Sequence, residues 1–270
     1  MKKVYPHIDH NPHQPILDIR RLSVQYGQTL VLDDITFHLH AGERVAVVGP
    51  NGAGKSTLFK VVAGVLAPTS GEVQIYGGGP SKHICIAYIP QRTQVDWNFP
   101  VSVADVVMMG RSAKMKPFSI PLRTDYEAVR KSLGTVDLLD LEKRQISQLS
   151  GGQQQRMFIA RALAQEAELI LMDEPLAGLD APSQEGVLSL LEVLHKQKVT
   201  VMVATHDLTQ AADYFDRILL LNHKIIGFGD ASEVMTTEKL LRAFGGKLKV
   251  VDVEGKVMAL DDSCCHGEDN

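Results

Sequence analysis

Alternation of apolar and polar residues predicts strands near the start of the chain. It runs along 16–27 and again along 31–40, as expected of half-buried antiparallel strands. Short, continuous apolar runs are instead typical of strands buried on both faces. Such runs occur at 44–49, 169–173 and 199–205. The first of these leads straight into a glycine-rich segment.

Helical spacing follows these buried runs. Residues 55–66 have it and are predicted to form a helix that ends near Pro68. In 182–198 the spacing places four apolar side chains on one helical face, namely Val187, Leu190, Leu191 and Leu194. Buried strands that alternate with helices predict an α/β fold with a parallel core, and the two alternating strands before it predict an antiparallel β subdomain.

Residues 92–165 are mostly helical in pattern and interrupt this alternation. The predicted helices are 104–111, 126–141 and 153–165. We therefore predict an inserted helical subdomain at 92–165, within a core formed by 16–91 and 166–245. Outside the core, residues 1–15 carry three prolines and three histidines and are predicted to be a disordered lead-in. Residues 246–270 are predicted to form a C-terminal extension, with a hairpin from 247–253 and 256–262 followed by a disordered tail.

Composition narrows the class of protein. Among 270 residues, 44% are hydrophobic and 22% charged, which suits a globular domain, and the net charge of −4 argues against a nucleic-acid partner. Three cysteines are too few for a disulfide framework and suit a reducing compartment. The sequence has no apolar run of about 18 residues and no signal-peptide pattern at its amino end. We therefore expect a soluble, cytoplasmic chain that reaches a membrane only through another protein.

The glycine-rich segment GPNGAGKST matches the phosphate-loop pattern G-x-x-x-x-G-K-[ST] in full. Its backbone N–H groups can surround phosphate oxygens at the positive end of the next helix. Lys55 can bridge the β- and γ-phosphates, and the Ser56 hydroxyl can ligate Mg²⁺. The predicted ATP-binding residues of this loop are Gly49, Pro50, Asn51, Gly52, Ala53, Gly54, Lys55, Ser56 and Thr57.

Two carboxylates end the apolar run LILMD, in the sequence LILMDEP. Because consecutive strand residues point to opposite sides, Asp173 and Glu174 can take different roles. Asp173 is suited to the Mg²⁺ shell, and Glu174 to polarising the attacking water as general base.

The octet LSGGQQQR lies between these two motifs. Ser150 is a good N-cap, Gly151 and Gly152 leave backbone amides exposed, and the residues from Gln153 onward are strongly helical. The octet therefore predicts a second helix start suited to phosphate.

In this order, these motifs resemble the nucleotide-binding subunit of an ATP-binding cassette (ABC) transporter over about residues 16–245. The resemblance implies a RecA-like P-loop NTPase fold and further site residues. Tyr26 resembles the aromatic residue that stacks on adenine, with packing inside the sheet as the alternative. Gln91, in YIPQR, matches the glutamine that contacts Mg²⁺ or the attacking water. Leu179 and Asp180 match the D-loop, and His206 matches the switch histidine that contacts the γ-phosphate.

In the family, the signature residues Ser150, Gly151, Gly152 and Gln153 of one subunit close over the ATP held by its partner. The resemblance thus implies a head-to-tail homodimer that binds ATP and Mg²⁺. It also implies integral-membrane permease subunits, an extracytoplasmic solute-binding protein, and a peripheral position on the inner face of the cell membrane.

Residues 89–111 resemble the importer branch that takes up manganese, zinc and related iron species. Import of chelated iron or another small solute, or a soluble ABC ATPase outside transport, remains an alternative. Trp97, Phe99 and Pro100 follow Gln91, where the permease docks in the family; the alternative is that this aromatic pair packs the helical subdomain. His7, His10, His13 and the tail Cys264-Cys265-His266 carry metal-ligand residue types, but their spacing favours solvated tails.

Overall fold

The computed structural model describes residues 14–79, 86–115, 119–245, 248–253 and 256–261. Within them, the central sheet has six strands in the order β5-β6-β7-β3-β8-β9. All neighbouring pairs are parallel except β8 with β9. The bounds are β3 (Arg44–Val48), β5 (Ile86–Ile89), β6 (Leu169–Asp173), β7 (Thr200–Thr205), β8 (Arg217–Asn222) and β9 (Lys224–Gly229).

A smaller antiparallel sheet contains β1 (Leu17–Tyr26) between β2 (Thr29–Leu39) and β4 (Ser70–Ile75). A tight turn joins β1 to β2, because Tyr26 pairs directly with Thr29 and Gly27 takes a positive φ of 59°. The two predicted antiparallel strands are confirmed. The sequence of the third strand, β4, shows no strong alternation of apolar and polar residues. This segment is a strand because it pairs with β1.

Alternate residues of the central strands enter two different cores. Val45 and Val47 of β3 belong to the cluster shared with the antiparallel sheet, whereas Ala46 and Val48 belong to the cluster shared with the helical region. The same alternation holds along β6, β7 and β8. Burial on both faces explains the continuous apolar runs, and the predicted parallel α/β core with an antiparallel β subdomain is confirmed.

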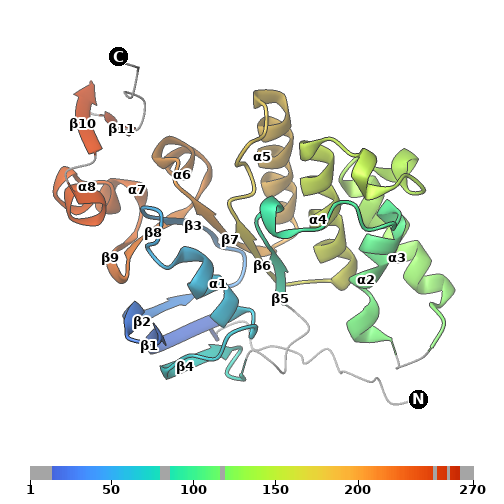
Figure 1. Ribbon diagram of the computed structural model, residues 1–270, viewed down its shortest axis with the longest axis horizontal. Coiled ribbons are helices and arrows are strands. Elements are labelled where there is room, and N and C mark those ends of the chain that lie inside the picture. Colours follow the sequence, from blue (N-terminus) through green and yellow to red (C-terminus); the bar gives the residue numbers. More distant parts are fainter. Residues whose placement is uncertain (1–13, 80–85, 116–118, 246–247, 254–255, 262–270) are drawn as a thin grey trace.

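Helices follow the central strands (Figure 1). They are α1 (Lys55–Val62), α5 (Ala181–Lys196), α6 (Leu208–Tyr214), α7 (Ala231–Val234) and α8 (Thr237–Phe244). The predicted apolar face of α5 is confirmed, because its four residues are at most 7% exposed. The prediction that the first helix continues to near Pro68 is wrong. It ends at Val62, because Gly64 takes a φ of 71° and closes the turn onto the carbonyl of Val61.

Residues between the two halves of the core form a helical region on one side of the sheet (Figure 1). It contains α2 (Val103–Met109), α3 (Arg123–Thr135), α4 (Gly151–Gln165) and short 3₁₀ turns. The predicted helix at 126–141 begins earlier and stops earlier than expected. Asp137 takes a φ of 55°, which interrupts the helix, and 139–141 form a separate turn.

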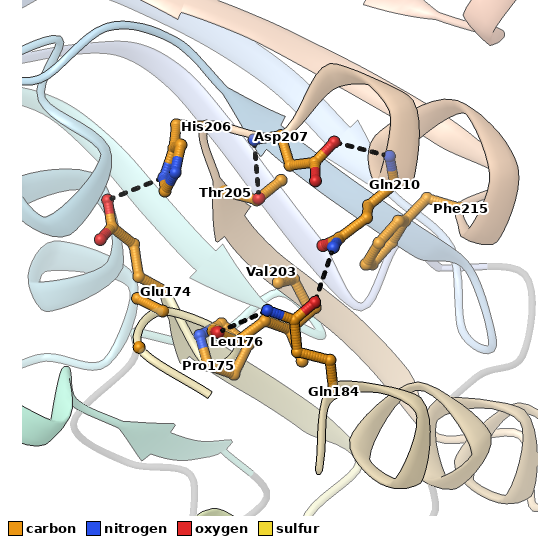
Figure 2. Close-up of a pocket in the computed structure, with 12 residues that line it drawn as sticks. Glu174, Pro175, Leu176, Gln184, Val203, Thr205, His206, Asp207, Gln210 and Phe215 are labelled. Atoms are coloured by element: carbon orange, nitrogen blue, oxygen red, sulfur yellow. Dashed lines mark hydrogen bonds and ion pairs between the residues drawn. The ribbon is translucent and has the colours of Figure 1, made fainter. Parts of the chain in front are cut away.

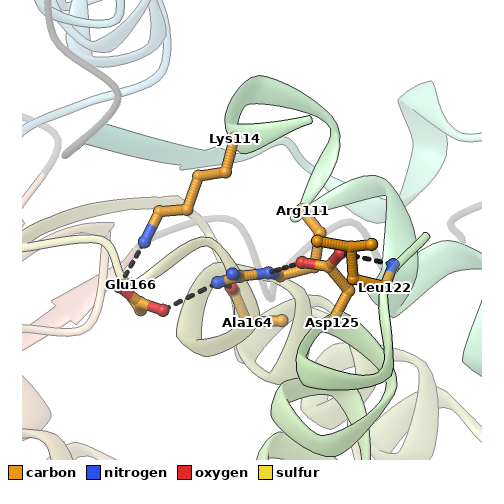
Figure 3. Close-up of polar contacts among 6 residues, drawn as sticks. All are labelled: Arg111, Lys114, Leu122, Asp125, Ala164 and Glu166. Atoms are coloured by element: carbon orange, nitrogen blue, oxygen red, sulfur yellow. Dashed lines mark hydrogen bonds and ion pairs between the residues drawn. The ribbon is translucent and has the colours of Figure 1, made fainter. Parts of the chain in front are cut away.

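A partly buried ion cluster joins three helices of this region (Figure 3). Arg111, just past α2, pairs with Asp125 of α3 at 3.0 Å and with Glu166, the C-cap of α4, at 2.7 Å. Arg111 also donates to the carbonyl of Ala164, and Lys114 pairs with Glu166. Burial lowers the pKa of Arg111, but its hydrogen bonds to the two carboxylates outweigh this, so the net pKa is raised. The cluster fixes the ends of the helices relative to one another.

Beyond α8, β10 (Leu248–Val253) pairs antiparallel with β11 (Lys256–Asp261). His7, His10, His13, Cys85, Cys264, Cys265 and His266 lie outside the described residues. Within the described part, no helix has the length and apolar character that crossing a membrane requires.

Candidate active site

The phosphate loop connects β3 to α1 and is shaped by glycines at close contacts. A Cβ at Gly49 would lie 2.0 Å from the carbonyl oxygen of Leu221, so no larger residue fits there. Gly54 has a φ of 99°, and a Cβ there would lie 2.6 Å from a methyl group of Leu32. The loop therefore needs glycine both for its backbone conformation and for its packing.

Lys55 is buried at the start of α1, at 6% exposure. Its Nζ donates to the carbonyl oxygens of Gly49 at 2.6 Å and Pro50 at 3.1 Å. Burial lowers the pKa of Lys55, while the carboxylates of Glu174 and Asp173 act in the opposite direction. The ammonium group is thus held within the loop, beside the acidic pair that follows β6.

An open cavity of about 580 Å³ lies against this loop. Among the described residues, its lining comprises Tyr26, Val31, Asn51, Gly52, Ala53, Gly54, Lys55, Ser56, Thr57, Gln91 and Glu174. Most of the sequence-predicted site thus meets at one cavity. Gly49 and Pro50 are not among these lining residues, and their carbonyl oxygens accept hydrogen bonds from Lys55 Nζ.

The two carboxylates after β6 do take different positions, but not for the predicted reason. Asp173 ends the strand, is 3% exposed, and accepts a hydrogen bond from the Tyr88 hydroxyl at 3.4 Å. Glu174 is not a strand residue: its φ of 48° turns the chain out of the sheet. The left-handed backbone conformation of Glu174, rather than strand alternation, therefore brings its carboxylate to the cavity. Burial, together with the charge of Asp173, raises the pKa of Tyr88 to about 12, so its hydroxyl stays a donor.

Gln91 and His206 each lie near a different oxygen of the Glu174 carboxylate. Gln91 Nε2 donates to Glu174 Oε2 at 3.2 Å, and His206 Nδ1 lies 4.0 Å from Glu174 Oε1 (Figure 2). His206 directly follows β7 and its side chain is 64% exposed, which leaves it free to contact a bound molecule. Both residues predicted to assist hydrolysis are therefore grouped around the predicted base.

Tyr26 lies at the end of β1 and is 49% exposed. The alternative that it is packed inside the sheet is wrong. Its ring lines the cavity beside the loop, where a flat aromatic group can stack on a planar ligand.

The signature segment starts α4 with the expected cap. Ser150 Oγ accepts from the amide of Gln153, and Gln153 Oε1 accepts from the amide of Ser150, which together form a capping box. The glycines do not simply expose amides, as the sequence had suggested. A Cβ at Gly152 would lie 2.7 Å from Ser183 Oγ, and one at Gly151 would lie 2.6 Å from Arg92 Nη1 and 2.9 Å from Leu179 Cδ2. Glycine at position 152 therefore lets α4 approach the start of α5. The signature residues and Asp180 do not line the described part of the cavity.

The two aromatic residues after Gln91 differ in their surroundings. Trp97 is half-buried, donates to the carbonyl of Arg92 at 3.1 Å, and packs edge-on against Phe158 of α4. Phe99 is 56% exposed, and Pro100 is exposed beside it. Trp97 therefore packs the helical region, and Phe99 remains available to a partner.

Comparison with known proteins decides the family. Residues 32–177, more than half of the chain, match the family described as ABC transporter. This chain belongs to the ABC transporter family. It is an ATP-binding subunit with the P-loop ATPase fold, so the predicted family, fold class and enzyme class are confirmed.

Three relatives cover nearly all of this ABC subunit. It is 44% identical to the manganese transport system ATP-binding protein MntB of Bacillus subtilis, over 90% of this chain and 97% of the relative. It is 43% identical to the zinc transport system ATP-binding protein TroB of Treponema pallidum, over 84% of this chain and 86% of the relative. A solved structure, described as an inward-facing conformation of a putative metal-chelate type ABC transporter, matches with a TM-score of 0.78 at 32% identity, over 93% and 99% of the two chains.

The sequence did not predict three polar residues in and near this ABC site. Tyr88 holds Asp173, and its place three residues before Gln91 was the available signal. Gln184 and Gln210 join the segments after Glu174 and His206. Amides on a helix face carry no pattern that marks a partner 26 residues away, so only the fold reveals them.

Proposed function

We propose that this chain hydrolyses ATP with Mg²⁺ at the phosphate-loop cavity and thereby powers the import of a transition-metal ion through a separate membrane permease. The observation that carries the proposal is the convergence of Lys55, Gln91 and Glu174 on one open cavity below the loop. An anion-binding loop and a carboxylate that can activate water are the two requirements of ATP hydrolysis.

Oxygen atoms at and beside this cavity suit Mg²⁺. At the cavity, Ser56 offers a hydroxyl and Gln91 an amide oxygen; Asp173, next to Glu174 in the chain, offers a carboxylate that accepts a hydrogen bond from Tyr88. Magnesium prefers such hard oxygen ligands and retains several waters, so a set of few protein ligands fits. When bound, the ion supplies charge neutralisation for the phosphates.

The remaining groups divide the chemical work. Lys55 exchanges its contacts with the loop carbonyls for the β- and γ-phosphates. Glu174 polarises the attacking water, which Gln91 orients, and His206 contacts the γ-phosphate from the opposite side. Tyr26 stacks on adenine. Each role uses a side chain that lies at, or beside, the cavity.

The signature residues Ser150 to Gln153 act on the ATP of a second copy. The capped start of α4 is suited to phosphate, yet it does not line this chain's own described cavity. A head-to-tail homodimer places it, with Asp180, against the partner's ATP. Closure on ATP and opening after hydrolysis then switch the permease between two states.

The proposed cargo rests on relatives that serve manganese and zinc transport. Chelated metal is the second candidate, favoured by the similarity to a metal-chelate type transporter. The complete system would include an extracytoplasmic solute-binding protein, with this subunit on the inner face of the cell membrane.

A transport assay tests the proposal. In cells that lack this chain, the wild-type chain should restore uptake of radiolabelled manganese, zinc or iron, and Lys55→Ala should not. Loss of the ammonium removes the positive charge that the phosphates need. Lys60→Ala, on the same helix, is the matched control. Restored uptake of a labelled chelate, without any uptake of the free ions, would favour the second candidate. Full uptake with Lys55→Ala would contradict the proposal.

Phe99→Ser should weaken docking of the permease. Removing a central aromatic anchor from an interface typically costs about 2 kcal/mol, so we expect roughly thirtyfold weaker association. Binding of the purified chain to the permease that co-purifies with it from membranes measures this. Val65→Ser, which changes another exposed apolar residue, serves as control. Equal affinity of the two variants would exclude docking at Phe99.

A further inference from the structure

Two glutamine side chains form a hydrogen bond between α5, which follows the Glu174 segment, and α6, which follows the His206 segment. Gln184 lies in α5 and Gln210 in α6, and Gln210 Nε2 donates to Gln184 Oε1 at 3.2 Å (Figure 2). Neither residue belongs to the motifs that identify the family. Both side chains are half-buried, so water competes only partly for this hydrogen bond.

The amide nitrogen of the Gln184 side chain contacts the segment that follows Glu174. Its Nε2 donates to the carbonyl oxygens of Leu179 at 3.1 Å and Leu176 at 3.4 Å. Leu176 is two residues from Glu174, so this amide fixes the chain directly after the predicted base. Because Nε2 is used in this way, only Oε1 remains to face Gln210.

The backbone of Gln210 is tied to the segment that contains His206. The backbone amide of Gln210 donates to Oδ1 of Asp207, the N-cap residue of α6, at 2.9 Å. The amide of Asp207 in turn donates to Thr205 Oγ1 at 3.1 Å. These two hydrogen bonds tie Gln210 to Asp207 and Asp207 to Thr205, the two residues that flank His206.

A cavity of about 190 Å³ lies between these two segments. Pro175 and Phe215 are among the residues that line it, so the segments do not pack tightly against each other here. At the sheet, the two segments are joined by the backbone amide of Glu174, which donates to the carbonyl of Ala204 at 3.0 Å. Beyond the sheet the cavity interrupts close packing, and the hydrogen bond between Gln210 and Gln184 joins the segments there.

We propose that Gln184 and Gln210 are positioning residues that set the separation of Glu174 and His206 for hydrolysis. This inference rests on the proposed ATP hydrolysis. The pair acts through backbone geometry and touches neither the nucleotide loop nor its cavity. The hydrogen bond between the two residues also has a required direction: residue 210 must be the donor, since residue 184 presents an acceptor.

Changing the polarity of residue 210 tests this direction. Gln210→Glu places an acceptor against Gln184 Oε1, and kcat of ATP hydrolysis should fall about tenfold, the equivalent of about 1.4 kcal/mol. The KM for ATP should change less than twofold, because the binding loop is untouched. Gln210→Lys keeps a donor and should retain at least half of kcat. Gln184→Met keeps the side-chain length without the amide, and should match Gln210→Glu.

Gln197→Glu, at the exposed end of α5, is the matched control for the added charge. Thermal unfolding of each variant shows whether a loss of kcat reflects loss of folded protein. The inference is overturned if Gln210→Glu or Gln184→Met keeps wild-type kcat, or if Gln210→Lys is as impaired as Gln210→Glu. Either result would leave the proposed function intact, provided that the wild-type chain hydrolyses ATP. A wild-type chain without ATPase activity would contradict the proposed function itself.

Discussion

Glu174→Gln is expected to bind ATP with unchanged affinity and to hydrolyse it about 10²- to 10⁴-fold more slowly. The amide keeps the size and hydrogen bonding of the side chain, including its contact with Gln91, but cannot take a proton from water. Because ATP then persists, the head-to-tail dimer should accumulate. ATP binding, turnover and the oligomeric state with ATP and Mg²⁺ measure these effects.

Glu238→Gln is the control for this substitution. Glu238 is exposed in the first turn of α8, a helix outside the cavity lining, and its loss of charge should leave turnover within twofold of wild type. Turnover by Glu174→Gln within tenfold of wild type would contradict the general-base role. Slow turnover without ATP-dependent dimers would instead contradict the proposed assembly.

Arg111→Met is expected to lower the free energy of unfolding by about 3–5 kcal/mol. The substitution leaves the carboxylate of Asp125 buried without its ion-pair partner, and it removes the link from α2 to the end of α4 (Figure 3). Chemical denaturation measures the loss. Arg123→Met is the matched control, because its ion pair with Glu127 is exposed and should contribute at most about 0.5 kcal/mol. Equal losses in the two variants would contradict the structural role of the cluster.

Acid should weaken the same cluster in the wild-type chain. Burial acts to raise the pKa of Glu166, but hydrogen bonds from Lys114 and Arg111 outweigh it and leave the pKa below its ordinary value. A lowered carboxyl pKa in the folded state stabilises the protein above the unfolded-state pKa, about 4.3. This stability is lost as the pH falls through the folded-state pKa. The difference between the wild-type chain and Arg111→Met should therefore shrink in acid; a constant difference down to pH 3 would contradict it.

The sequence was most informative where local chemistry leaves little freedom. The phosphate loop requires glycine at Gly49 and Gly54, and those requirements are visible as a motif. Strands buried on both faces must be continuously apolar, which located β3, β6 and β7. The amphipathic face of α5 was equally clear, because one helix face alone meets the core.

Element ends and partner choices were harder to predict. The helix from Lys55 ends at Val62 rather than near Pro68, because Gly64 takes a backbone conformation in the left-handed region. Strand alternation did not correctly predict how the Glu174 side chain is positioned, since the positive φ of Glu174 turns the chain out of the sheet. Trp97 and Phe99 look alike in the sequence, and only the packing of Phe158 against Trp97 separates their surroundings.

The sequence by itself determined the family, the ATP chemistry and the order of strands and helices, because these depend on motifs and periodicities within short segments. Tertiary structure alone decided that Gly152 of the signature packs against the start of α5, that Arg111 joins three helices, and that Gln184 meets Gln210. Each of these contacts joins residues far apart in the chain. No local pattern encodes such a contact, since it exists only when two elements are packed at a particular distance.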